Sequence, residues 1–320
     1  MSGKIKITVL DGHAANPGDL SWDSFKEYAE LTVYDRTPSE QVIERIGNSD
    51  AIFLNKVQIT REILQKCPDL KYIGVLATGY NVVDCKAARE YGITVTNIPA
   101  YSTDSVAQHV FALILNFTNL VEQHNQEVKK GGWIKSPDFC FWNSPLTELT
   151  GKTLGILGFG SIGQKTAKIA HAFGMNVIIH VHSEKSFTGN EKTVSLEELF
   201  KQSDFLSLHT PMTDETAGII NEKNLSLMKN SAIIINTARG GLADEKALYK
   251  ALSEQKIAGY AADVILQEPM VKDCPLLNAP NCVLTPHIAW APKETRERLF
   301  GIALSNLKAY LDGSPINVVS

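Results

Sequence analysis

The first hundred residues alternate between short apolar runs and segments whose apolar residues recur at helical spacing. Strands that alternate with helices in this way are typical of a parallel α/β sheet. The apolar runs predict strands over residues 4–12, 31–36, 51–55, 70–78 and 93–98, and the spaced segments predict helices over 21–31, 38–49 and 84–92.

The pattern changes after Pro99. Residues 102–132 begin with Ser and Thr caps, keep helical spacing and close on Gly131-Gly132, which together predict one long helix. An irregular aromatic segment follows at 133–149. Strands and helices then alternate again up to about residue 286, and the chain ends in a single amphipathic helix.

A chain of 320 residues has the length of two domains. The last helix, 292–313, has no strand of its own, whereas the first block lacks a cover for its sheet, so we expect this helix to pack back on that block. The fold class is therefore α/β, with two Rossmann-like domains (one flavodoxin-like, one dinucleotide-binding) that contain parallel sheets. We expect residues 1–98 and 290–320 to form a discontinuous outer domain, and residues 99–289 to form the dinucleotide-binding domain inserted within it.

Composition and charge narrow the functional classes. With 44% hydrophobic and 21% charged residues, the chain can build a core in each domain. Its 31 basic and 35 acidic residues give a net charge of −4, and no basic run favours nucleic acid. The N-terminal apolar run is too short and too charged for a signal peptide, and no apolar stretch reaches membrane-spanning length.

The cysteines indicate a reducing compartment. They are odd in number, scattered and without C-x-x-C spacing, which is typical of reduced thiols rather than of a disulfide framework or a zinc site. We therefore expect a cytoplasmic protein that holds no metal and binds neither nucleic acid nor membrane. The cysteines are Cys67, Cys85, Cys140, Cys274 and Cys282.

A glycine turn lies at the start of the second alternating block. Gly158, Gly160 and Gly163 form G-x-G-x-x-G between an apolar strand and a helix, the context in which this motif binds a dinucleotide. The first glycine permits the turn, the second admits the pyrophosphate, and the third brings helix and strand together. We expect the pyrophosphate at the helix start, near Ser161 and Ile162.

The strand after this helix lacks the acid that normally binds the adenine ribose about 20 residues past the turn. Val181 and His182 stand there, followed by Ser183, Glu184 and Lys185. The serine and lysine suit a 2′-phosphate, whereas Glu184 suits a ribose if the loop bends. The sequence leaves NAD and NADP both open at this point.

Three later segments each end at a predicted strand terminus, where ligand-binding residues gather in such sheets. AIIINTARGG supplies Arg239, AGYAADVILQEP supplies Glu268, and NCVLTPHIAW supplies His287. Each residue alone also fits a structural reading, as a surface cation, a surface acid or a satisfied histidine. Together with the glycine turn, and in this order, they favour a catalytic set.

This set resembles that of the D-isomer-specific 2-hydroxyacid dehydrogenases, whose catalytic trio is an Arg, a Glu and a His in the same order. The resemblance extends over essentially the whole chain, including LATGYNVVD at 76–84, YSTDSVAQHVFALIL at 101–115 and SLHTPMTDETAGIIN at 207–221. Within the family, TGYNVVD, NIPAYSTDSVAQ and SPDFCFW are most similar to glycerate dehydrogenases, also called hydroxypyruvate reductases.

The chemistry of these side chains fits the reduction of a 2-keto acid. His287 is the natural proton donor for the new alkoxide, because the pKa of an imidazole lies near working pH. Glu268 is the carboxylate that favours imidazolium and fixes the ring. Arg239 offers a planar fork of donors to the substrate's carboxylate and carbonyl oxygens.

The resemblance implies further binding residues. The backbone of Ala77, Thr78 and Gly79 would bind the substrate carboxylate, and Lys56 and Trp290 are weaker candidates on the substrate side. Lys56 fits a solvated loop lysine equally well, and Trp290 fits packing at a domain interface.

The family cofactor is NAD(H), and NADP(H) stays possible because the ribose-binding acid is absent. The expected cofactor-binding set is Gly158, Gly160, Ser161, Ile162, Gly163, His182, Ser183, Thr210, Pro211, Thr237, Ala238 and Asp263, the last of which resembles the residue that holds the nicotinamide carboxamide.

Residues 101–145 resemble the family's dimerisation arm. Exposed aromatic residues there suit a symmetric homodimer interface, although an intramolecular core is the alternative. They are Trp133, Phe139, Phe141 and Trp142.

The expected function is that of a cytoplasmic oxidoreductase that reduces hydroxypyruvate to D-glycerate, with glyoxylate to glycolate as a second reaction. Phosphoglycerate, D-lactate and formate dehydrogenases are alternatives; no regulatory domain follows Ser320, and the long first-domain insertions of formate enzymes are absent. A corepressor that senses NAD(H) shares the resemblance but would carry a disordered tail.

Overall fold

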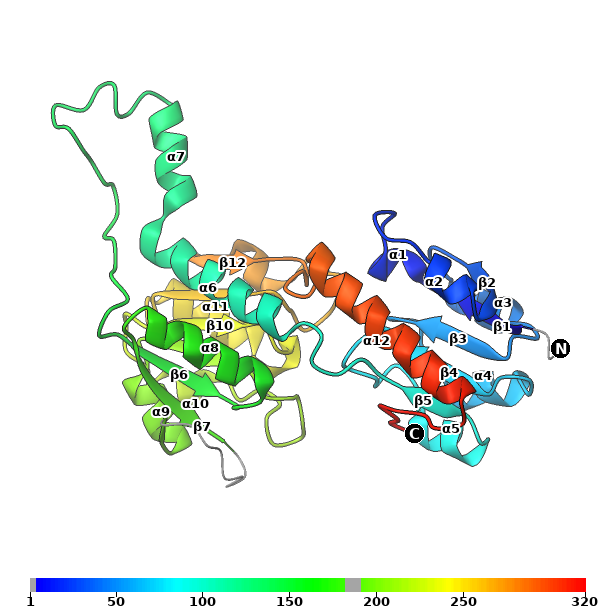
Figure 1. Ribbon diagram of the computed structural model, residues 1–320. Coiled ribbons are helices and arrows are strands. Elements are labelled where there is room, and N and C mark those ends of the chain that lie inside the picture. The colour runs from blue at the N-terminus through cyan, green and yellow to red at the C-terminus, as the bar shows by residue number, and fades with distance from the viewer. Residues whose placement is uncertain (1–3, 182–190) are drawn as a thin grey trace. The chain divides into compact units, whose positions relative to one another are not determined.

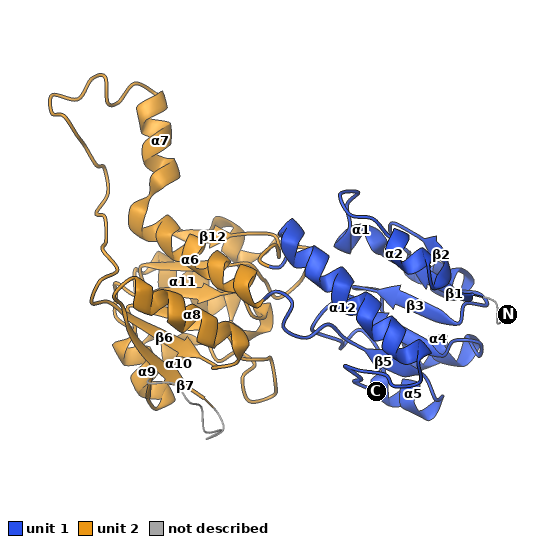
Figure 2. Cartoon of the chain, viewed as in Figure 1, with its two compact units in different colours: residues 1–102, 290–320 blue, residues 103–289 orange. Residues whose placement is uncertain are grey.

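The computed structural model describes residues 4–181 and 191–320 (Figure 1). The chain divides into two compact units, coloured separately in Figure 2. Unit 1 comprises Met1–Ser102 and Trp290–Ser320, and unit 2 comprises Thr103–Ala289. The first boundary thus lies four residues beyond residue 98, because the segment up to Ser102 packs within unit 1.

Unit 1 is built on a five-stranded sheet of order β2-β1-β3-β4-β5, and each neighbouring pair is parallel. This is the flavodoxin-like order. The expected strand at 31–36 begins earlier and the helix expected before it is a single turn, since residues from Ala29 onward pair with β1. The strands are β1 Ile5–Val9, β2 Ala29–Val33, β3 Ala51–Leu54, β4 Tyr72–Val75 and β5 Thr94–Thr96.

Helices cover both faces of this sheet. One core contains buried residues of α3, α4 and α5, and the other contains those of α1, α2 and α12. The C-terminal helix packs on the first block, since Leu299, Phe300, Ala303 and Leu307 of α12 are buried in the second core. The helices are α1 Gly12–Ala15, α2 Asp23–Lys26, η1 Ser39–Gln41, α3 Val42–Ile46, α4 Arg61–Lys66, α5 Cys85–Glu90 and α12 Lys293–Leu311.

Unit 2 contains a seven-stranded sheet of order β12-β11-β10-β9-β6-β7-β8, again parallel throughout. The order reverses between β6 and β9, the point at which open α/β sheets bind ligands. The predicted fold class is confirmed by these two parallel sheets. The strands are β6 Thr153–Leu157, β7 Asn176–His180, β8 Lys192–Thr193, β9 Phe205–Leu208, β10 Ile233–Asn236, β11 Gly259–Ala262 and β12 Cys282–Leu284.

The helices of unit 2 also form two layers. Buried residues of α6 and α8 pack on one face of the sheet, and those of α9, α10 and α11 pack on the other. Among the described residues, no helix has both the length and the apolar character that a membrane span requires. The helices are α6 Thr103–Asn119, α7 Val121–Lys129, α8 Ser161–Ala172, α9 Leu196–Gln202, α10 Glu222–Leu225, η2 Gly240–Leu242, α11 Glu245–Ser253 and η3 Pro275–Asn278.

The prediction of one helix over 102–132 is wrong. Leu120 has a left-handed backbone, with φ of 50°, and separates α6 from α7. Helix α6 buries one face against α8 and the sheet, whereas α7 has no buried residue, so packing does not hold the two in line. Figure 1 shows α7 and the loop after it projecting from the body of unit 2.

Candidate active site

Most of the predicted residues of unit 2 lie after the carboxyl ends of its strands. The glycine turn follows β6, Thr210 and Pro211 follow β9, and Thr237 to Arg239 follow β10. Asp263 follows β11 and His287 follows β12. One edge of one sheet therefore carries all of these groups, because parallel strands end on the same side.

The glycine turn is shaped as the motif requires. Gly158 has φ of +90°, and a Cβ on it would lie 2.8 Å from the backbone of His209 and Thr210. A Cβ on Gly163 would lie 2.5 Å from Gly158 O, so only glycine lets α8 approach β6 this closely. A Cβ on Gly160, in contrast, would meet nothing within 4 Å. The turn is thus closed on its inner side and open at its second glycine.

Helix α8 begins with free donors. Gly160 is its N-cap and offers no side-chain cap, and the N–H groups of Ser161 and Ile162 donate to no group within the described residues. These donors, together with the helix dipole, suit an anionic pyrophosphate. The residues present therefore fit a dinucleotide at this turn.

The side chain of Asn236 holds the segment that follows β10. The sequence analysis did not single out this residue. Its side chain is fully buried, accepts from Ala238 N and donates to Arg239 O at 2.9 Å. Thr237 Oγ1 lies between these contacts as a buried oxygen without a hydrogen-bond partner in the described part of the chain. A polar group of a ligand would satisfy it. The available signal was an Asn that ends an otherwise apolar strand.

The predicted ribose-binding residues lie only partly within the described part of the chain. Strand β7 ends at His180, whose Nδ1 faces Val194 O at 3.0 Å, and Val181 packs against the core beneath α8. His182 and Ser183 lie outside the described residues.

His287 and Glu268 form a hydrogen-bonded pair. The distance from His287 Nδ1 to Glu268 Oε2 is 2.6 Å, and each side chain is about a third exposed. Glu268 Oε1 also accepts from Ile265 N at 3.3 Å. The carboxylate therefore holds the ring through Nδ1 and leaves Nε2 for a substrate.

The backbone of His287 is left-handed, with φ of 54°, which is uncommon for a residue with a side chain. Buried Asp263 holds the loop on both sides of it. Asp263 Oδ1 accepts from Thr285 Oγ1 at 2.6 Å and from Ile288 N at 2.8 Å, and Oδ2 accepts from Ala289 N at 2.8 Å. These bonds offset the cost of the unusual conformation.

Helix α6 reaches the same loop through His109, another residue that sequence reasoning missed. His109 Nε2 lies 3.0 Å from Thr285 Oγ1. Because the Thr285 hydroxyl donates its proton to Asp263, its oxygen accepts from His109. The loop is thus fixed from β11 and from α6.

Arg239 stands apart from this pair. Its side chain is exposed, and its Nη1 donates to the neighbouring Ala238 O at 2.7 Å. The contacts of the described residues bring Glu268 and His287 together but do not join Arg239 to them.

Lys56 and the segment Ala77–Gly79, predicted in unit 1, lie just after strands of its own sheet. The backbone N–H of exposed Lys56 is held by the buried Asp11 carboxylate at 2.6 Å, and Asp11 also accepts from Asn55 N and Val57 N. The segment Ala77–Gly79 follows β4. Trp290 packs against the core that contains α12.

Comparison with known proteins places these features in a family. A model described as D-isomer specific 2-hydroxyacid dehydrogenase, NAD binding domain matches residues 111–289. The chain is 49% identical to a hydroxypyruvate reductase of Blautia hydrogenotrophica, over 99% of this chain and 100% of the relative. It is 39% identical to a glycerate dehydrogenase of Methylorubrum extorquens, over 98% of each.

A solved structure resembles the whole chain as well. An acyclic imino acid reductase in complex with NADPH and D-Arg has a TM-score of 0.86 and 36% identity, and the match covers 99% of this chain and 100% of that one.

Proposed function

This chain belongs to the D-isomer specific 2-hydroxyacid dehydrogenases and is an NAD(P)(H)-dependent oxidoreductase, and we propose that its reaction is the reduction of hydroxypyruvate to D-glycerate. The observation that carries the proposal is the 2.6 Å His287–Glu268 pair at the carboxyl edge of the sheet that holds the glycine turn. The relatives named hydroxypyruvate reductase and glycerate dehydrogenase support the substrate. Glyoxylate, one carbon shorter, is the second substrate we expect.

The nicotinamide cofactor, when bound, supplies the hydride. His287, protonated at both ring nitrogens, donates the Nε2 proton to the oxygen that becomes the hydroxyl and is left as a neutral imidazole, while Glu268 stabilises the protonated ring before the transfer through Nδ1. Asp263 keeps the His287 loop in place during this transfer. A proton donor held in one orientation lowers the barrier more than a free one does.

The substrate carboxylate is assigned to cationic and N–H donors. We propose that the exposed guanidinium of Arg239 binds it with the backbone of Ala77, Thr78 and Gly79, and that Lys56 adds positive charge. The turn formed by Gly158, Gly160 and Gly163 is assigned to the pyrophosphate. The assignments of Ser161, Ile162, His182, Ser183, Thr210, Pro211, Thr237 and Ala238 to the cofactor, and of Trp290 to the substrate side, are part of the same proposal.

A homodimer is the proposed assembly, acting in the cytoplasm. Residues of the segment after α7 expose large apolar side chains, among them Ile134 at 89% and Phe139 at 90%. An open apolar hollow on α6 and α8, lined by Phe111 and Leu115, offers a second surface for another copy. The five cysteines are unpaired thiols, which a reducing compartment maintains.

A substrate panel tests the proposed function. We would measure cofactor oxidation with hydroxypyruvate, glyoxylate, pyruvate and 3-phosphohydroxypyruvate, and expect the largest kcat/KM with hydroxypyruvate. A larger kcat/KM with 3-phosphohydroxypyruvate would identify a phosphoglycerate dehydrogenase. A larger kcat/KM with pyruvate would identify a D-lactate dehydrogenase. Cofactor binding without turnover of any 2-keto acid would favour a nucleotide-sensing protein instead.

A further inference from the structure

A buried asparagine interrupts the apolar face that α12 packs on the sheet of unit 1. Asn306 is fully buried, and its amide makes two hydrogen bonds. Its Nδ2 donates to Asn97 O at 2.9 Å, and its Oδ1 accepts from Asn317 Nδ2 at 2.7 Å. A buried amide is costly unless it is paired, so its place on an apolar helix face needs an explanation.

The bonds continue from Asn306 to the segment that follows β4. Asn97 N donates to Asn317 O at 3.2 Å, which closes a ring of three asparagines. Asn97 Nδ2 then donates to Thr78 O at 2.7 Å. The C-terminal residues of the chain are thereby connected to Thr78 through the side-chain amides and the backbone of these asparagines.

Three consecutive carbonyls of this segment are held by unit 1. Leu76 O accepts from Asn55 Nδ2 at 2.7 Å, Ala77 O accepts from Ile98 N at 3.0 Å, and Thr78 O accepts from Asn97. The Thr78 hydroxyl donates to Ile98 O at 2.8 Å.

The N–H groups of the same segment are left as donors. Those of Ala77, Thr78 and Gly79 donate to no other group in the part of the chain that the structure describes. Successive N–H groups that are left as donors where the backbone bends, as it does at residues 76–78, suit an anion.

We propose that Asn97 and Asn306 are positioning residues for the substrate carboxylate. Asn97 holds the Thr78 carbonyl and Asn306 holds Asn97, so that the N–H groups of residues 77–79 are presented in advance to the carboxylate of a small 2-keto acid. The inference rests on the proposed function, and it adds residues that do not themselves touch the substrate. Preorganised donors bind an anion more tightly than donors that must first be ordered.

The test uses Asn97→Ala and Asn306→Leu in the full-length protein. Leucine keeps the volume and apolar packing of α12, and the alanine variant leaves that helix unchanged, so one of the two tests the idea if the other fails to fold. We expect the KM for hydroxypyruvate to rise about tenfold, the scale of one lost positioning bond. The kcat at saturation should change less than about twofold, and the Kd of NADPH from fluorescence titration should not change.

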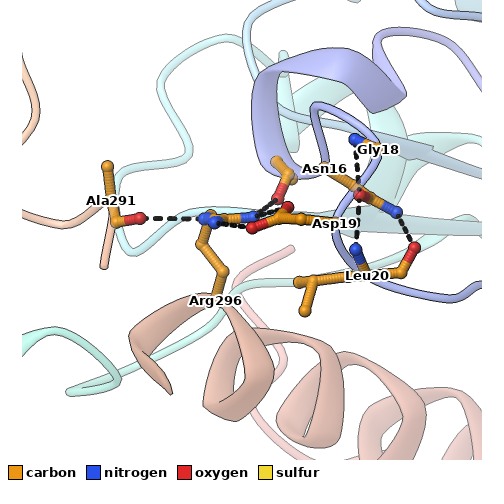
Figure 3. Close-up of polar contacts among 7 residues, drawn as sticks. Asn16, Gly18, Asp19, Leu20, Ala291 and Arg296 are labelled. Carbon is orange, nitrogen blue, oxygen red and sulfur yellow. Dashed lines mark hydrogen bonds and ion pairs between the residues drawn. The ribbon is translucent and has the colours of Figure 1, made fainter. Parts of the chain in front are cut away.

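Asn16→Ala is the matched control. Asn16 is also a buried asparagine of unit 1, and its side chain accepts from Gly18 N and Leu20 N and donates to Leu20 O, all outside the segment in question (Figure 3). This variant should lower Tm without raising KM. An equal rise of KM in Asn16→Ala, or an unchanged KM in the two network variants, would overturn the proposal.

A binding measurement separates this proposal from the function on which it rests. Oxamate, a small carboxylate, should shift the NMR amide resonances of residues 77–79 in the wild type at concentrations that leave Asn97→Ala unshifted. If the wild type shows these shifts but does not reduce hydroxypyruvate, hydroxypyruvate is not the substrate, whereas the carboxylate site and its positioning residues stand. A wild type without the shifts would refute the carboxylate site and the positioning role together.

Discussion

At the scale of single residues, the conformation of His287 is the most demanding feature of the site. A left-handed backbone at a histidine costs on the order of 1 kcal/mol or more and persists only where the surroundings hold it. Asp263 supplies the necessary bonds through both carboxylate oxygens, and Glu268 orients the ring. Two buried or half-buried acids thus set the position and direction of one proton donor.

Substitution of the proton donor is the first prediction. His287→Ala should lower kcat by roughly 10²- to 10⁴-fold, the usual scale for one general acid. Glu268→Gln keeps the size of the side chain but removes its charge, and should lower kcat less. The Kd of NADPH serves as a control, because it reports whether the cofactor site is still folded, and it should be unchanged in both variants. A loss of less than tenfold in His287→Ala would remove this residue from the role of acid.

At the scale of secondary structure, the site depends on how closely α8 approaches β6. Gly163→Ala would place a Cβ 2.5 Å from Gly158 O, which is backbone and cannot rotate away. The helix must then move, so we predict a loss of about 1–3 kcal/mol of stability and about a tenfold weaker cofactor affinity. Denaturant titration measures the loss of stability, and fluorescence titration with NADPH measures the change in cofactor affinity.

Gly301→Ala provides the control for this change. It also adds a Cβ to a glycine inside a helix, α12, but nothing lies within 4 Å of that Cβ. Its stability should be unchanged or should rise by up to about 1 kcal/mol, because alanine favours the helix. Equal effects of the two substitutions would contradict the steric argument at Gly163.

The end of β9 carries a pH-dependent contribution to stability. Desolvation lowers the pKa of His209 from its usual 6.5 to about 4, while Ser207 Oγ lies 2.9 Å from its Nε2. Between these values the unfolded chain binds the proton and the folded chain does not, so the free energy of unfolding falls as pH falls. Below pH 4 both states are protonated and this loss is complete.

The variant His209→Asn tests this contribution. The free energy of unfolding of the variant and of the wild type is measured with urea at pH 7 and pH 4.5. The difference between the two proteins isolates the contribution of His209 from that of other titrating groups. We predict a smaller loss of stability on acidification in the variant. Parallel losses in the two proteins would show that His209 does not titrate in this range.

The local pattern of the sequence predicts these elements better than it predicts their contacts. The alternation of strands and helices and the glycine turn between β6 and α8 are local signals, and the structure has these elements, whereas the catalytic roles of Glu268 and His287 stay predictions. The break at Leu120 left no such signal, because it arises where tertiary packing stops. The Asn306–Asn97 bond joins residues 209 apart, and no periodicity encodes such a pair.

At the scale of the whole molecule, each unit builds its own cores on both faces of a parallel sheet. The segment of residues 130–146, which follows α7, contributes to none of these cores. Its exposed Trp133, Ile134, Phe139 and Trp142 would meet water in a single copy. Large exposed apolar groups of this kind are typical of a protein interface.

The prediction at this scale concerns assembly. Ile134→Asp with Phe139→Asp should convert a dimer into monomers in sedimentation velocity, because charges at an apolar interface are desolvated without a partner. Leu277→Asp, which changes a side chain 51% exposed elsewhere in unit 2, is the control and should stay dimeric. A wild type that sediments as a monomer at tens of micromolar would contradict the assignment of this segment to dimerisation.

The central claim is that this chain reduces hydroxypyruvate through the His287–Glu268 pair, with a cofactor preference that the sequence leaves open. Its most direct test is steady-state reduction of hydroxypyruvate with NADH and NADPH side by side, with chiral analysis of the product. We predict one mole of D-glycerate for each mole of cofactor oxidised, with NADPH accepted because Val181 and His182, rather than an acid, directly follow β7 in the sequence. Formation of L-glycerate, or no oxidation of either cofactor, would contradict the account.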